Sequence, residues 1–159
     1  MILLGEETLI QYKTFVKWTD TLRDLDDHLW SSPIAEGKAS PADIISHLQN
    51  WDHYLIHKVI PAVRKGEGMV FPDFDSFNKQ AYEYARSGVS KTRLLDEFKQ
   101  TRLQLVDLLL AEPDVAAKPV PANGLAYCPH TNTPYSLLYI IHEFREHDIH
   151  HKHQILSVI

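Results

Sequence analysis

Two histidines near the C-terminal end of the chain have the spacing expected of metal ligands. The last eighteen residues, HEFREHDIHHKHQILSVI, contain five of the ten histidines. On a helix that turns about 100° per residue, His147 and His151 lie about 40° apart, on a face shared with Leu137, Ile140, Phe144 and Ile155. An imidazole in an apolar seam must satisfy two ring nitrogens, so two such rings one turn apart suit a shared divalent metal. The other three point elsewhere, and we expect them to be solvated: His142, His150 and His153.

A third ligand is available on an earlier predicted helix. His47 lies beside an apolar sector formed by Ile44, Leu48, Trp51, Leu55 and Val59. His53 and His57 are also four residues apart, but they lie about 80° to 120° from His47, on the side away from that sector. We expect His53 and His57 to be solvated, since exposed positions are usual for polar side chains. The predicted metal ligands are therefore His47, His147 and His151.

Three neutral imidazoles leave at least one coordination position of a metal open, as in catalytic rather than closed structural sites. Such a metal keeps its full charge and lowers the pKa of a bound water to about 7, or deprotonates a thiol. Imidazole suits zinc, nickel, copper and iron alike, so the residue types do not select the metal. The outer ring nitrogens also need partners, for which the helical positions offer Asn50, Tyr54, Glu143 and Gln154. The sequence assigns no catalytic acid or base.

Two better-known metal patterns are excluded. The stretch from His142 and Glu143 to His147 resembles a zincin signature, but its histidines are five residues apart, about 140° around a helix, rather than four. A di-iron carboxylate bundle needs Glu-x-x-His on two helices, and no Glu-x-x-His occurs in the chain. A single buried histidine is more often a hydrogen-bonded core residue than a ligand, but three on two facing stripes favour the metal.

The first two predicted helices carry one apolar stripe each. Steps of three and four residues predict a helix over 6–29, closed by Pro33 and Gly37, with the stripe Phe15, Trp18, Leu22, Leu25 and Leu29. In the second helix Ser40 is the cap, Pro41 takes the first turn and Asp43 completes a capping box. This helix is expected to run to about position 65 and to stop near the glycines at 66 and 68.

Three further elements complete the prediction. A short helix is expected over about 76–86, between Pro72 and Gly88. Ser90 caps the next helix, which ends before Pro113 and carries the stripe Leu94, Leu95, Phe98, Leu105 and Leu109. A proline-rich loop of about twenty residues without a clear element follows. Thr133 and the proline after it are expected to start the final helix, which continues nearly to the C-terminus.

No run with strand periodicity competes with these helices, so the predicted fold is a single all-α domain over 1–159, a four-helix bundle. At 1.5 Å per residue, His47 lies about 10 Å into its helix, and the pair on the final helix lies about 15 Å from the C-terminus. These depths match best when the two helices are antiparallel. A crossover over 66–88, between the second and third bundle helices, gives that up-down-down-up order and contains the short helix.

Composition and charge exclude several classes of protein. Sixteen basic and twenty-one acidic residues give a net charge of -5, and no stripe of Lys or Arg could follow a nucleic-acid backbone. The single cysteine, Cys128, excludes an internal disulfide; it is read as a small loop or core residue, with a place near the mouth of the metal site as the alternative. The start MILLGEET lacks the features of a signal peptide, and no apolar run suits a membrane span. We expect a cytoplasmic protein.

These features resemble the DinB/YfiT-like superfamily of metal-binding four-helix bundles. The resemblance covers nearly the whole chain and rests on SHLQNWD around His47, the aromatic DSFN stretch in the crossover, and EHDIHHKHQI with His147 and His151. It implies an up-down-down-up bundle in which three histidines hold a divalent metal, often nickel or zinc, with iron or manganese as further candidates. It also implies a homodimer.

The resemblance implies one fold but several possible activities. Members of the superfamily include S-transferases and isomerases that use low-molecular-weight thiols, and metal-dependent hydrolases. We therefore expect an enzyme that activates water or a thiol for a small-molecule substrate. The alternatives are a non-catalytic metal-binding or sensing protein, and a dimeric interaction module with a structural metal. A cavity beside the three histidines, under the proline-rich loop, would favour the enzyme, whereas a sealed metal would favour the alternatives.

Overall fold

The computed structural model describes residues 5–159, so the first four residues of the MILLGEET start lie outside the described part. Helices account for all the regular secondary structure of the described residues, and the only extended pairing is in isolated bridges. The helices are α1 (Glu6–Thr21), η1 (Leu22–Asp24), α2 (Asp27–Ser31), α3 (Pro41–Tyr54), η2 (Leu55–Val59), α4 (Ile60–Arg64), α5 (Phe74–Ala85), α6 (Lys91–Ala111), α7 (Pro113–Ala117) and α8 (Leu137–Leu156). None of these helices is long and apolar enough to cross a membrane.

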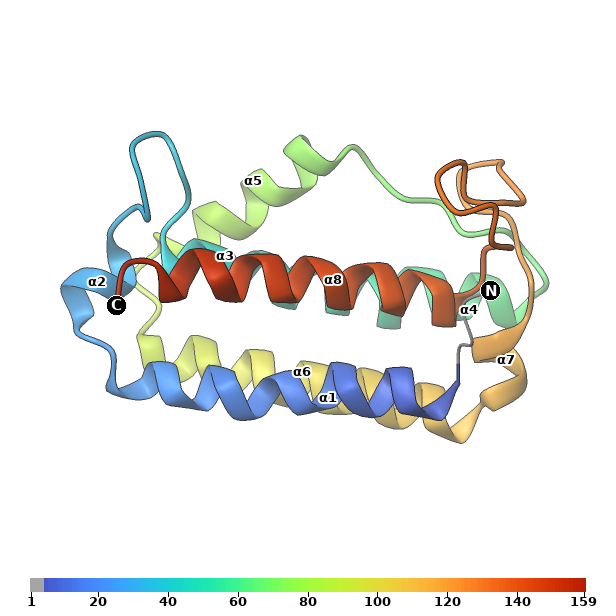
Figure 1. The fold of residues 1–159 in the computed structure, drawn as a ribbon, viewed down its shortest axis with the longest axis horizontal. Helices are drawn as coiled ribbons and strands as arrows, with labels where there is room; N and C mark the ends of the chain where they lie inside the picture. The colour runs from blue at the N-terminus through green and yellow to red at the C-terminus, as the bar shows by residue number, and fades with distance from the viewer. Residues whose placement is uncertain (1–4) are drawn as a thin grey trace.

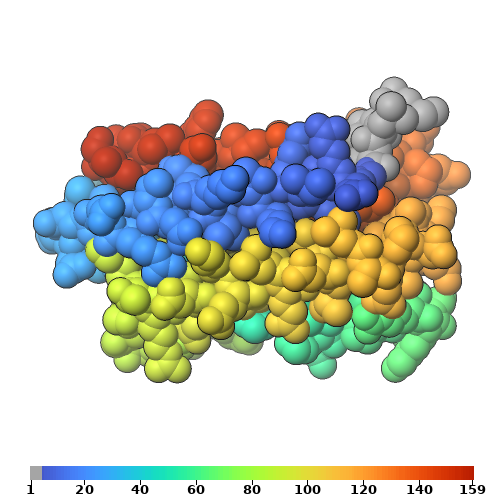
Figure 2. All heavy atoms as spheres, turned by 90° about the horizontal axis from the view of Figure 1, so that it is seen from below, coloured from blue at the N-terminus to red at the C-terminus, as the bar shows by residue number. Residues whose placement is uncertain are grey.

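Four long segments form the bundle: α1, α3 continued through η2 and α4, α6, and α8 (Figure 1). α1 packs against α6 and α8, and α3 also packs against α6 and α8. The face turned toward the viewer in Figure 2 is built largely by α1 and α6. The prediction of an all-α four-helix bundle is therefore confirmed.

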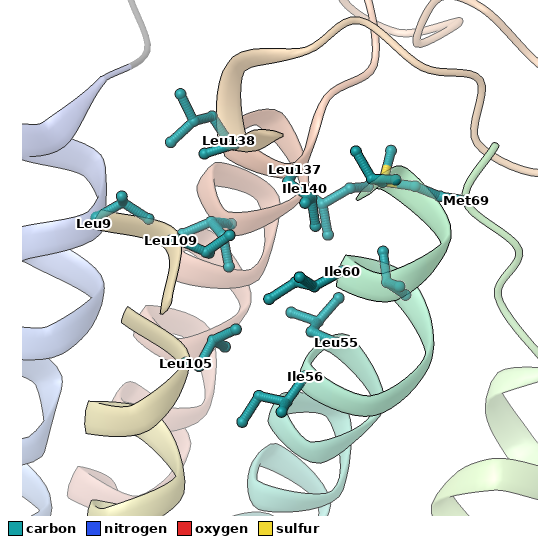
Figure 3. Close-up of a cluster of buried hydrophobic side chains, with 14 of the residues drawn as sticks. Leu9, Leu55, Ile56, Ile60, Met69, Leu105, Leu109, Leu137, Leu138 and Ile140 are labelled. Atoms are coloured by element: carbon teal, nitrogen blue, oxygen red, sulfur yellow. The ribbon is translucent and has the colours of Figure 1, made fainter. Parts of the chain in front are cut away.

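The directions of the helices follow from two buried clusters at opposite ends of the bundle. One cluster contains residues from the start of α1 and α8 and from the end of α6, such as Leu9, Leu137 and Leu109 (Figure 3). The other contains residues from the start of α3 and α6 and the end of α8: Ile44, Leu94 and Ile155. Consequently α1 and α8 run in one direction, and α3 and α6 run in the other.

The first predicted helix is interrupted. The structure ends α1 at Thr21, and after a 3₁₀ turn Leu25 takes an extended conformation with ψ of 138°. Asp26 then accepts a hydrogen bond from the backbone N–H of His28 and caps α2. The prediction of one continuous helix over 6–29 is therefore wrong, because apolar periodicity persists across a break that a capping aspartate creates.

The second bundle helix begins as predicted and then contains an unpredicted π turn. The capping box is confirmed, since Ser40 accepts from the N–H of Asp43 and Asp43 accepts from the N–H of Ser40. The π turn over Leu55–Val59 lies just before Pro61. Proline lacks an N–H and its ring clashes with the carbonyl four residues earlier, so a wider turn at this point lets the helix continue.

The crossover carries α5, which packs along α3. Its N-cap is Asp73, whose carboxylate accepts from the N–H of Ser76, so α5 starts slightly earlier than predicted. The hydroxyl of Ser46 on α3 donates to the carbonyl of Ala81 at 2.6 Å. α5 thus covers the outer face of α3 near His47, whose ring lies 6.1 Å from that of Tyr82.

The segment predicted as a structureless loop contains a short helix and a tight turn, so that prediction is wrong. α7 begins at Pro113. Asn123 and Gly124 both have positive φ, 48° and 82°, and Ala122 and Leu125 exchange two backbone hydrogen bonds across them. Asn-Gly is a strong signal for such a turn, because both residues tolerate positive φ.

The final helix starts three residues later than predicted. Ser136, not Thr133, caps α8 by accepting from the N–H of Tyr139. Pro134 is instead held in an extended bridge with Tyr127, and this pairing delays the helix.

Candidate metal centre

The structure brings the three predicted ligands together. His47 comes from α3, and His147 and His151 come from successive turns of α8. One ring nitrogen of each histidine lies within 4.8 Å of the others, and the Nε2 atoms of His147 and His151 are 3.0 Å apart. The ring of His47 lies 5.4 Å from that of His147 and 4.7 Å from that of His151. Because α3 and α8 run in opposite directions, the early turns of one helix meet the late turns of the other.

His47 carries the clearest evidence for a missing partner. Its side chain is 2% exposed, yet neither Nδ1 nor Nε2 has a hydrogen-bond partner among the described residues. Burying such a group unpaired costs about 1–3 kcal/mol, so native proteins rarely leave it so. Burial, followed by the two neighbouring histidines, lowers the pKa of His47 well below its usual value. The ring is therefore neutral at pH 7, and its lone pair is available to a divalent metal.

His151 is oriented by a hydrogen bond that also fits this role. Its Nδ1 lies 2.7 Å from Oε1 of Gln154, one turn further along α8. The amide oxygen only accepts, so Nδ1 carries the proton and Nε2 keeps its lone pair facing His147. Burial, with a smaller contribution from His147, lowers the pKa of His151 to about 4. Burial and the neighbouring His150 likewise lower the pKa of His147. The three rings together are a donor set that a divalent metal would satisfy.

Of the four residues predicted as partners of the outer ring nitrogens, Gln154 alone hydrogen-bonds a histidine of the site among the described residues. Asn50 borders a small hollow between α3 and α5, beside His53. The hydroxyl of Tyr54 donates to the carbonyl of Val70. Glu143 faces a larger cavity and accepts from the thiol of Cys128, with Sγ and Oε1 3.8 Å apart.

The remaining histidines lie outside the cluster. His150 and His153 are exposed, as predicted, whereas His142 is only partly exposed. His57 is exposed and stacks on His53, with ring centroids 5.7 Å apart. His53 itself is half-buried and lies 3.3 Å from Oγ1 of Thr101, so its prediction as a solvated residue is wrong. Its neighbour Thr101 comes from α6, which packs over that side of α3.

A cavity of about 440 Å³ reaches the histidines at His147. Its walls are mainly apolar and aromatic, and include Trp51, Phe71 and Phe144. Two segments that flank it, the start of the crossover and the Asn-Gly turn, are joined by backbone hydrogen bonds: the N–H of Met69 donates to Pro121, and that of Asn123 donates to Met69. The three histidines become more exposed toward the cavity, from buried His47 to half-buried His151 to exposed His147. The cluster is therefore open on one side.

A buried polar hub lies between the two apolar clusters and joins all four bundle helices. Arg102 of α6 donates from Nε to Asp52 at 2.7 Å and from Nη1 to Asp148 at 2.8 Å. Tyr12 of α1 donates its hydroxyl to Asp52 at 2.6 Å. Arg102 is 0% exposed, and its guanidinium carbon lies 3.5 Å from the centre of the Tyr12 ring.

Burial and the buried charge pairs act against each other in this hub. Burial raises the pKa of Tyr12, and it raises that of Asp148 to about 7 although Arg102 acts in the opposite direction. Burial alone would lower the pKa of Arg102, but Asp148 and Asp52 outweigh it and hold that pKa above its ordinary value. This hub was not predicted from the sequence. Its signal was an arginine at the position where the α6 stripe, between Phe98 and Leu105, should be apolar.

Comparisons with known proteins support the fold and identify the family. No curated protein matches this sequence. The solved structure of YfiT from Bacillus subtilis, described as a probable metal-dependent hydrolase with an unusual four-helix bundle topology, matches with a TM-score of 0.62. The match has 14% sequence identity and covers 96% of this chain and 82% of YfiT, so it shows a shared fold. The family model of the DinB superfamily matches residues 12–155, and this chain therefore belongs to the DinB superfamily.

Proposed function

We propose that this protein is a divalent-metal-dependent enzyme whose metal is held by His47, His147 and His151. In this proposal the protein activates water or a thiol against a small-molecule substrate, as a hydrolase or a low-molecular-weight thiol S-transferase. One observation carries it: a buried histidine, without hydrogen-bond partners among the described residues, faces two further histidines, of which His147 lines a cavity of about 440 Å³. The description of YfiT as a probable metal-dependent hydrolase also supports the proposal of a metal-dependent enzyme.

In the proposed reaction, different residues of the chain would have different roles. A divalent metal at three neutral imidazoles supplies a Lewis acid that brings the pKa of water or a thiol toward neutrality. Gln154 holds the Nδ1 proton of His151 and so keeps its Nε2 unprotonated. Glu143 lies on the cavity wall one turn before His147, where its carboxylate can accept a proton from the activated group. The apolar walls bind the substrate and limit the access of bulk water.

The cavity favours an enzyme over the two alternatives. A structural metal is normally enclosed by four protein ligands, whereas this cluster offers three and is exposed at His147. A cavity of this volume is within the range that holds small organic ligands. Nickel or zinc as the metal and a homodimer belong to the proposal on the strength of the family resemblance. A cytoplasmic location belongs to it because the single cysteine suits a reducing compartment.

Elemental analysis of purified variants tests the ligand set. The wild-type chain should hold about one equivalent of divalent metal after loading and desalting, and His47→Ala, His147→Ala and His151→Ala should hold far less. Two matched controls keep their metal: His57→Ala, from the same bundle helix as His47, and His153→Ala, from α8. Full occupancy in His47→Ala would refute its assignment. Hydrolytic or thiol-transfer activity that chelation removes and metal restores would then establish catalysis, whereas full occupancy without either activity would favour a sensor.

A further inference from the structure

The charged side chains that line the cavity beside the histidines are acidic. The cavity wall carries the carboxylates of Glu143 and Asp148, and no lysine or arginine is among the described residues that line it. Asp148 is already neutralised by Arg102. Arg102 cannot also donate hydrogen bonds to a ligand in the cavity. It is 0% exposed, and its N–H groups already donate to Asp52, Asp148 and the carbonyl of Tyr12. In the metal-free chain the uncompensated charge on the cavity wall is therefore that of Glu143.

Aromatic side chains are the commonest type in the remaining lining. Trp51 is at the centre, with Phe74, Phe144 and Phe71 at centroid distances of 5.2, 5.9 and 6.4 Å. The face of an aromatic ring carries negative electrostatic potential, so it attracts cations and binds neutral apolar groups, but offers nothing to an anion. The rings and Glu143 thus both favour a positively charged ligand over a negatively charged one.

The polar groups of the wall do not reverse this bias. The Nε1–H of Trp51 donates to Oδ1 of Asn78 at 2.8 Å, and the N–H of Phe71 donates to Oδ1 of Asn123 at 2.8 Å. These bonds fix the orientation of both amides, since the nitrogen groups of Trp51 and Phe71 only donate. A ligand would meet neutral amide groups there, and a neutral donor cannot replace the counter-charge that an anion loses on leaving water.

The rim of the cavity is apolar as well. Phe74 and Leu125 line the cavity and are 60% and 51% exposed; Val70 and Tyr127, near them in the sequence, are 69% and 56% exposed. Large exposed apolar side chains that gather at the mouth of a cavity mark a binding surface. The part of the ligand that crosses the rim should therefore be apolar.

We propose that this cavity binds small molecules with an aromatic or branched apolar body that are neutral or positively charged, and that Glu143 sets the preference for positive charge. This inference rests on the proposed function only in treating the cavity as the substrate site. A divalent metal at the three histidines would attract an anionic group to itself, so the preference applies to the part of the substrate that contacts Glu143 and the rings. For that part it favours neutral or cationic esters and amides, and disfavours low-molecular-weight thiols that carry several carboxylates.

Three probes with one phenyl ring and different charges test the preference: phenyltrimethylammonium, benzyl alcohol and benzenesulfonate. Their dissociation constants would be measured on the full chain by NMR titration after removal of metal, so that coordination plays no part. The ammonium should bind at least about tenfold more tightly than the sulfonate, which corresponds to one charge interaction near the protein surface. Glu143→Gln should bring this ratio close to one by weakening the ammonium, and should leave benzyl alcohol unchanged.

Glu146→Gln is the matched control, because Glu146 lies on the same helix but pairs with Arg145 outside the cavity. It should keep the wild-type ratio. Glu143 is exposed, so its substitution does not endanger the fold. Equal or tighter binding of the sulfonate, an unchanged ratio in Glu143→Gln, or no binding of any probe would overturn the proposal. Since the assay uses metal-free protein, a failure of metal binding in the His47→Ala series and a failure of this charge preference are separate results.

Discussion

At the scale of single residues, the contact between His151 and Gln154 controls which ring nitrogen is available. Without the acceptor at Nδ1, the proton of the neutral imidazole is free to move to Nε2, where it blocks the lone pair. We predict that Gln154→Ala lowers metal affinity by about 10- to 100-fold, the effect typical of losing an outer partner of a metal-bound histidine. Competition with a chelator of known affinity measures this change. Asn50→Ala removes an amide that bonds no histidine and should leave the affinity unaltered; an equal loss in both variants would contradict the role of Gln154.

The sequence was sufficient to find the histidines, because helical periodicity determines which face a residue occupies. It named Gln154 among four candidate partners, but it could not single out the one that bonds a histidine of the site. Tyr54 is within reach of the site by its position on the helix, but its hydroxyl bonds the carbonyl of Val70, far away in the sequence. Cys128 is buried with its thiol directed at Glu143, which depends on how the loop folds back over α8. Such contacts depend on rotamers and loop geometry, which apolar periodicity does not encode.

At the scale of the elements, the polar hub fixes how the helices that carry the histidines face each other. Asp52 and Asp148 lie on the same helices as His47 and His147, and Arg102 joins the two carboxylates from a third helix. We predict that Arg102→Met destabilises the fold by about 3–5 kcal/mol, because two buried carboxylates lose their counter-charge. Urea unfolding measures this loss.

Two further variants separate the charge from the packing of this side chain. Removing all three charges, in Asp52→Asn with Arg102→Met and Asp148→Asn, should recover much of the stability, since a buried pair is often replaceable by uncharged groups. Arg93→Met changes an exposed arginine of the same helix and should cost under about 0.5 kcal/mol. A loss in Arg102→Met no larger than that in Arg93→Met would show that the hub contributes little.

The elements themselves were predictable to different degrees. Ser40 and Ser90 cap their helices as predicted, because a cap is a local interaction between residues three apart. The break at Leu25 and the π turn before Pro61 were missed, since the apolar stripe continues through both. The Asn123–Gly124 turn had a recognisable signal that the prediction of a structureless loop did not use.

At the scale of the whole molecule, the long crossover through α5 decides whether the site exists. It lets α3 and α6 run in the same direction, so that α8 returns antiparallel to α3 and His47 meets His147 and His151 at the same depth (Figure 1). Three imidazoles are then held close together in a partly buried place. Because these imidazoles resist protonation, the stability of the metal-free fold should depend on pH.

The metal-free protein should lose stability as the pH falls from about 6.5 toward about 4. The pKa values of His47, His147 and His151 are lowered from an ordinary 6.5, that of His151 to about 4, with burial as the main cause. In this window these three imidazoles bind protons in the unfolded chain but not in the folded one, which lowers the free energy of unfolding as the pH falls. Asp148 acts in the opposite direction, because its pKa is raised to about 7, but it is one group against three. Urea unfolding at pH 7 and pH 5 after chelation measures the dependence.

His47→Leu removes the most buried of these imidazoles and should flatten the pH dependence of the metal-free protein, whereas His57→Leu, an exposed change on the same bundle helix, should preserve it. An equal pH dependence in the wild type and in His47→Leu between pH 7 and pH 5 would contradict the neutral state assigned to the cluster, because Asp148 contributes alike to both. A bound divalent metal should add stability at pH 7 and lose that contribution on acidification, because protons and metal compete for the same lone pairs. The metal-loaded chain should therefore show the steeper decline, and a parallel course of the two curves would mean that the added metal binds elsewhere.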